Sequence, residues 1–212
     1  MKLEQIDNSI VIIADRHNPS ILHPSFLENK GIIDAGTDLA EPPLCTAEIS
    51  IASFKNGLRF TVDTSRLQIT NQILNENDFD ISKIASSYVK ELPNVDYKSV
   101  GCNLFMFIEK EDAESFLISK FIKHGTWNRG TSTLDSAGLR FVYSTDEGQI
   151  NISYDAGEIV KNGDQPRSGI LIKGNYHTNV SGIDETISIL NSFSSKMEML
   201  ASYMETTFED EI

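Results

Sequence analysis

The stretch Val100–Gly125, with the sequence VGCNLFMFIEKEDAESFLISKFIKHG, decides the fold. It opens with Gly101–Ile108, an apolar run of strand length with almost no alternation. Such a run is typical of a strand that is covered on both faces, and its phenylalanine and isoleucine residues favour a strand over a helix. We therefore expect this segment to lie at the centre of the core.

An amphipathic helix is expected directly after this strand. Asp112 is its predicted N-cap, because the carboxylate can accept a backbone N–H that has no partner in the first turn. Gly125 marks the expected end of the helix. Its apolar face is predicted to contain Phe116, Leu117 and Phe121.

The rest of the chain supplies further strands and helices. Asn56-Gly57 separates two strand-like segments and predicts a tight hairpin, in which Leu58, Phe60 and Val62 point inward. Other strands are expected at 10–14, 66–69, 139–143, 149–154 and 169–180, and helices at 24–31, 81–92 with Asp80 as N-cap, and 183–208.

This order of elements predicts an α+β fold, a largely antiparallel sheet with helices packed on it. No long polar linker interrupts the chain, so we expect a single domain over residues 1–212. A second interpretation is that two βαββα-like units share one core. Ile10–Gly31 and Leu104–Gly125 both run from a strand through a polar turn to a helix that contains Ser-Phe-Leu.

Composition and charge exclude several classes of partner. The chain has 212 residues and a net charge of −13, which disfavours nucleic acid and anionic membranes. No apolar run approaches the length of a membrane span, so a cytoplasmic protein is expected. Cys45 and Cys102 lack the spacing of metal ligands and are expected to be reduced and buried. We predict no metal and no cofactor.

The loop at residues 125–138 is the first candidate site. It holds the chain's single tryptophan, Trp127, with Arg129 close by, and Lys123 and His124 precede it. Tryptophan and arginine are enriched at the centres of protein interfaces, and long loops in compact domains are often functional. These four residues form a predicted partner-binding site; the alternative is that Trp127 packs onto the core.

Asp15, Arg16 and His17 form an alternative polar site at the end of a predicted strand, with His23 nearby. Charged groups gathered after a strand can make a catalytic site, but the two histidines have no diagnostic metal spacing. A capped turn with surface histidines is the simpler interpretation.

The terminal helix predicted over 183–208 shows a 3.5-residue apolar repeat. Such a repeat fits packing within the monomer, or a homodimer through this helix.

The sequence contains no catalytic signature, and the function predicted from it is that of a non-enzymatic partner-binding protein, an accessory or regulatory subunit. One alternative is an enzyme with a site near Asp15, Arg16 and His17. Another is an acidic inhibitor or immunity-type protein for a basic partner, to which the negative charge would steer it.

Overall fold

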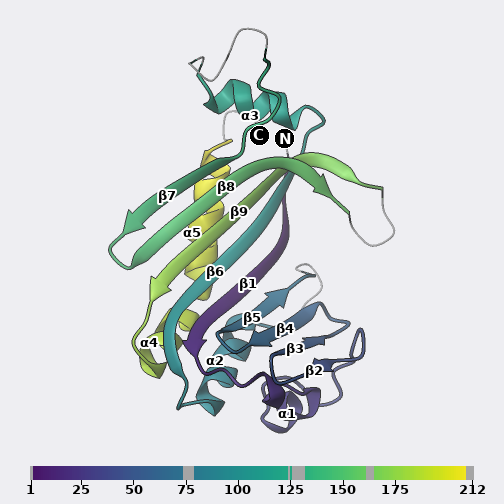
Figure 1. Cartoon of the computed structure of the whole chain (residues 1–212), viewed down its shortest axis with the longest axis vertical. Helices are drawn as coiled ribbons and strands as arrows, with labels where there is room; N and C mark the ends of the chain where they lie inside the picture. Colours follow the sequence, from purple (N-terminus) through teal and green to yellow (C-terminus); the bar gives the residue numbers. More distant parts are fainter. Residues whose placement is uncertain (1, 74–78, 124, 126–131, 161–164, 209–212) are drawn as a thin grey trace.

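A computed structural model describes residues 2–73, 79–123, 125, 132–160 and 165–208. Its main element is a nine-stranded antiparallel sheet with the order β2-β3-β4-β5-β1-β6-β9-β8-β7 (Figure 1). The strands are β1 (Leu3–Asp15), β2 (Leu44–Cys45), β3 (Ile49–Ser53), β4 (Leu58–Asp63), β5 (Arg66–Asn71), β6 (Asp96–Glu109), β7 (Leu139–Thr145), β8 (Gly148–Ile159) and β9 (Arg167–Asn179). The predicted α+β class is confirmed.

The helices lie against one face of this sheet, and α5 runs behind β9 and β6 in Figure 1. They are the 3-10 helix η1 (Pro19–Ile21) and the α-helices α1 (Pro24–Asn29), α2 (Ile81–Glu91), α3 (Ala113–Phe121), α4 (Ile183–Asn191) and α5 (Phe193–Thr206). Within the described residues, no helix is long and apolar enough to span a bilayer.

The sheet consists of two halves with the same topology. In each half a long strand, β1 or β6, is followed by helical structure, then by three strands, and then by helical structure again. The first half has in addition the two-residue strand β2, which precedes its three strands. The last of the three strands pairs antiparallel with the long strand, and β1 and β6 pair with each other at the centre. The halves are therefore βαβββα units, one strand longer than the predicted βαββα. The single domain over 1–212 stays a prediction.

Strict alternation divides the side chains between the two faces of the sheet. One cross-strand row joins Phe60, Ile69, Ile10, Cys102, Tyr176 and Ile150, which are all fully or almost fully buried. The next row joins Thr70, Ser9, Asn103, Asn175 and Asn151. Since neighbouring residues of a strand point to opposite faces, the helices cover the apolar rows and leave the polar rows open.

Several local predictions are confirmed. Gly57 has a φ of 86°, which suits the Asn56-Gly57 turn between β3 and β4, and the inward residues of β4 are buried. The carboxylate of Asp80 accepts the backbone N–H of Ser82 at 2.9 Å and caps α2. The run Gly101–Ile108 lies in β6 and is mostly buried, as predicted, but the expectation that it is covered on both faces is wrong, because Asn103 and Phe105 are half-buried and line the open face.

Three predictions about the ends of elements are wrong in whole or in part. Asp112 is the N-cap residue of α3, as predicted, but its carboxylate forms no capping hydrogen bond and instead pairs with Lys110 at 3.1 Å. Helix α3 ends at Phe121, before Gly125. The predicted helix over 183–208 is interrupted at Ser192, so that α4 and α5 are separate. The buried side chains of α5 pack inside the chain; they are Phe193, Lys196, Leu200 and Met204. A homodimer through this segment stays a prediction.

The two cysteines differ in exposure. Cys102 lies in β6 and is fully buried, as predicted, and burial raises the pKa of its thiol to about 12. Cys45 lies in the edge strand β2 and is exposed, which contradicts the prediction. Its thiol donates a hydrogen bond to the carbonyl of Leu22 at 3.2 Å.

We predict that Gly174→Val destabilises the protein by about 1–3 kcal/mol, the usual cost of overpacking. A Cβ atom at Gly174 would lie 2.2 Å from Met204 Cε and 3.2 Å from Leu200 Cδ2, so a larger side chain pushes α5 from the sheet. Chemical denaturation measures the free energy of unfolding. His177→Val, on the same strand but the open face, is the control, and equal effects of both substitutions would contradict the prediction.

Candidate functional site

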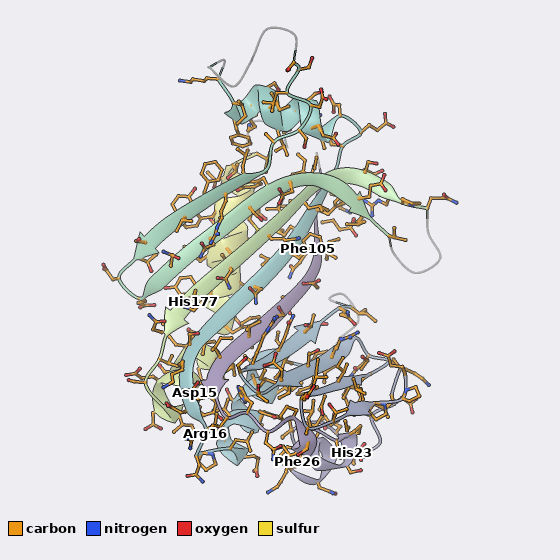
Figure 2. All side chains as sticks on the ribbon, in the orientation of Figure 1. Asp15, Arg16, His23, Phe26, Phe105 and His177 are labelled. Carbon is orange, nitrogen blue, oxygen red and sulfur yellow. The ribbon has the colours of Figure 1, made fainter. Side chains whose placement is uncertain are left out.

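A groove of about 540 Å³ lies on the open face of the sheet, over β1, β6, β9, β8 and β7. Figure 2 labels Phe105, one of its lining residues, on β6. The side chains that line the groove are mostly polar and come from alternate positions of the five strands. They include Asp7, Asn103, Phe105, Arg140, Asn151, Ser153, Lys173 and Asn175.

A row of amide side chains crosses the floor of the groove. Asn175 Nδ2 donates to Asn103 Oδ1 at 2.8 Å, and Asn103 Nδ2 donates to Ser9 Oγ at 3.3 Å. Gly101 leaves room for this row, because a Cβ atom there would lie 3.0 Å from Asn175 Nδ2. The row is thus held in place by its own hydrogen bonds across three strands, which prepares its remaining donors and acceptors for a ligand.

A second row beside it carries the charges. It joins Asp7, Phe105, Lys173, Ser153 and Arg140 from β1 to β7. The guanidinium of Arg140 donates to Asn151 Oδ1 at 2.7 Å, which connects the two rows. Lys173 Nζ lies 5.9 Å from the centre of the Phe105 ring, within the range of a cation–π contact.

Asp7 is the carboxyl group of the groove. Burial raises its pKa above the ordinary value of 3.8, although the positive charge of Lys173 opposes this shift. The ionised form of Asp7 is therefore less well solvated in the groove than it would be in water. Groups of this kind gather at functional sites.

This arrangement suits the binding of a polar molecule. The described residues of the groove supply amide donors and acceptors, two cations, one carboxyl and one aromatic ring, and they include no histidine or cysteine. Ligand sites in proteins commonly have volumes of about 300–1,000 Å³. In the part of the chain that the structure describes, no group of three or more His, Cys, Asp or Glu side chains could hold a metal ion.

The residues of the predicted polar site do not converge. Figure 2 shows Asp15 and Arg16 at one end of β1, with His23 separate from them. Asp15 pairs with Lys98 at 3.6 Å on the surface, and Arg16 is exposed with a φ of 70°, in a left-handed turn.

His17 turns inward, is 4 % exposed and packs edge-on against Tyr97. His23 caps α1 by accepting the N–H of Ser25. The three consecutive side chains therefore share no site.

His17 is a buried group with few polar contacts. Within the described residues neither ring nitrogen makes a hydrogen bond of good geometry, but the backbone of Ile12 and the charge of Asp63 lie near enough to act against the fall in its pKa. Burial outweighs both effects and lowers the pKa below the ordinary value of 6.5, so the ring is neutral at pH 7.

The predicted partner-binding loop cannot be placed. Trp127, Arg129 and His124 lie outside the described residues, and Lys123, which follows α3, is exposed. This site stays a prediction.

Sequence reasoning missed the groove because its residues are scattered over five strands. One signal was present: Gln149, Asn151 and Ser153 alternate with the inward residues Ile150, Ile152 and Tyr154 of β8. Alternation of this kind indicates an open polar face, but it does not show which other strands share that face.

A search for related proteins gives no further guide to the site: no protein-family model matches this chain, and no curated protein is significantly similar to it.

We predict that His17→Leu weakens the acid sensitivity of the fold. The unfolded chain takes up a proton near pH 6.5, while the buried ring resists protonation. Stability is therefore lost as the pH falls from the unfolded pKa toward the folded pKa. Urea denaturation between about pH 7 and 5 should show that the free energy of unfolding falls less for the variant than for the wild type. A variant with an unchanged pH profile would contradict the assignment.

We also predict that Asp7→Asn stabilises the protein at neutral pH. Because the pKa of Asp7 is higher in the folded protein than the ordinary value of 3.8, ionisation of this carboxyl lowers the stability of the fold. The loss begins as the pH rises above 3.8 and is complete above the pKa of the folded state. Thermal unfolding of both proteins measures the effect. The difference in stability between the variant and the wild type should shrink below the unfolded pKa, where Asp7 is protonated in both the folded and the unfolded state. A destabilised variant at neutral pH would refute the prediction.

Proposed function

We propose that this protein is a non-enzymatic binding protein, an accessory or regulatory subunit, and that its groove is the recognition site. The observation that supports the proposal is the one-sided covering of the sheet. Helices pack on the apolar rows, while the described residues place no element over the amide and charged rows. A polar face with its own hydrogen-bond network suits recognition without chemistry.

Two features of the groove fit binding better than catalysis. Among the described residues, its lining has no histidine or cysteine to act as a base or nucleophile at neutral pH. The amide of Asn103 and the guanidinium of Arg140 are engaged in hydrogen bonds that fix their orientation. Groups positioned in this way provide specificity.

The alternative enzyme site at Asp15, Arg16 and His17 has no support from the geometry, because these side chains diverge. No particular observation favours the acidic-inhibitor alternative, and it stays a prediction, as do a cytoplasmic location and a protein partner.

The proposal can be tested by a substitution that fills the groove with a large side chain and leaves the fold intact. Ser153 lies in the groove, and Ser144 lies on the same face of the neighbouring strand outside the groove lining. Tryptophan is well accepted in strands, so Ser153→Trp and Ser144→Trp form a matched pair. Each tagged protein is purified from its own host, and its companion, either protein or small molecule, is identified by native and denaturing mass spectrometry.

The wild type and Ser144→Trp should retain the same companion, and Ser153→Trp should lose it. Circular dichroism confirms that all three are folded. Retention by Ser153→Trp, or a wild type that carries nothing under gentle conditions, would refute the groove as the recognition site.

A further inference from the structure

Two cations line the groove, and the charge of one of them, Lys173, acts on the Asp7 carboxyl of the same groove. Among the described residues, neither Arg140 nor Lys173 forms an ion pair. Some other basic residues of the sheet and helices do: Arg167 binds Glu4 and Glu109, and Lys196 binds Glu147. Within the described residues Arg66 and Lys90 also form no ion pair, so the distinguishing feature of Arg140 and Lys173 is that both line one groove.

Both cations can reach one point above the sheet. Lys173 and Arg140 lie in the same cross-strand row, with Ser153 between them on β8. Adjacent strands are about 4.8 Å apart, so the backbones of these two residues are roughly 10 Å apart. Their long side chains can close that distance around a single anionic group, with Ser153 between them in the row.

The guanidinium of Arg140 is already oriented for this task. One of its terminal nitrogens donates to Asn151 Oδ1 at 2.7 Å, which restricts the rotation of the side chain. A guanidinium has five N–H donors, and those outside this hydrogen bond can bind a carboxylate or phosphate.

The rest of the groove indicates the body of the ligand. The amide row of Asn103, Asn175 and Asn151 both donates and accepts hydrogen bonds, as hydroxyl or amide groups of a ligand require. Phe105 offers a patch of aromatic surface in the charged row. The volume of about 540 Å³ suits a small molecule.

We infer that the groove binds a small organic anion, with its carboxylate or phosphate group between Lys173 and Arg140 and its polar body along the amide row. This inference rests on the proposed function, since it assigns a ligand class to the same groove. Asp7, at the far end of the charged row, then limits affinity for the anion and disfavours ligands with negative charge at both ends.

The test compares anionic and neutral molecules of the same shape. ¹⁵N-labelled protein is titrated with glucose 6-phosphate and with glucose, and separately with glutarate and with glutaramide. Only the anionic members should shift the Arg140 Nε–H signal and the side-chain amide signals of Asn151 and Asn175, with a Kd of about 1 mM or lower. The phosphate and carboxylate pairs show which anionic group the site prefers.

Variants test whether the two cations hold the anion. Lys173→Met and Arg140→Met should each weaken binding about tenfold or more, as expected for a lost charge-assisted hydrogen bond. Asp7→Asn should tighten binding. Arg66→Met removes the same charge from the open face at β5, outside the groove, and should leave the Kd unchanged.

Each other outcome overturns the inference in a distinguishable way. Equal binding of the anionic and neutral members refutes the anion site but leaves the groove as a recognition site. An equal loss from Arg66→Met shows general electrostatic attraction and refutes a built site. Absence of shifts with all four molecules refutes small-anion binding, while the Ser153→Trp comparison decides separately whether the groove is used at all.

Discussion

The register between β1 and β6 is the constraint on which the rest of the structure depends. These two long strands join the halves of the sheet, and Ile10 lies opposite Cys102 while Ser9 lies opposite Asn103. A shift of one residue would exchange the faces of either strand, and would bury amides under the helices while exposing isoleucines. The apolar core and the polar open face are therefore two consequences of the same pairing.

An irregularity in this pairing lies beside the end of the groove. The register shifts between Gln5 and Asp7, so that Glu4 lies opposite Phe107 and Asp7 lies opposite Phe105. Asp7 belongs to the regular register that also places Ser9 on the open face, and it enters the groove from there. The extra residue before it puts Glu4 on the same face, where Glu4 binds Arg167.

The groove is a place where the protein gives up stability. Burial raises the pKa of Asp7, although the charge of Lys173 opposes this shift. Within the described residues neither Lys173 nor Arg140 forms an ion pair, whereas Arg167 is paired with Glu109 at 2.8 Å. A buried carboxyl and two such cations at one hollow are the basis of the proposed ligand site.

The sequence by itself determined the local structure and the fold class. The Asn56-Gly57 hairpin and the Asp80 cap follow from contacts between residues close in the chain, so their patterns are local. The apolar composition of the β6 run is also visible in the sequence, although its burial comes from the distant strands β1 and β9 and the helices. Only the tertiary structure decided which side chains meet. Asp15, Arg16 and His17 are consecutive, yet a left-handed turn and the inward rotation of His17 separate them. Asp7, Lys173 and Arg140 are far apart in sequence but share one row, because strand order and register bring them together, and neither can be derived from the periodicity of a single strand.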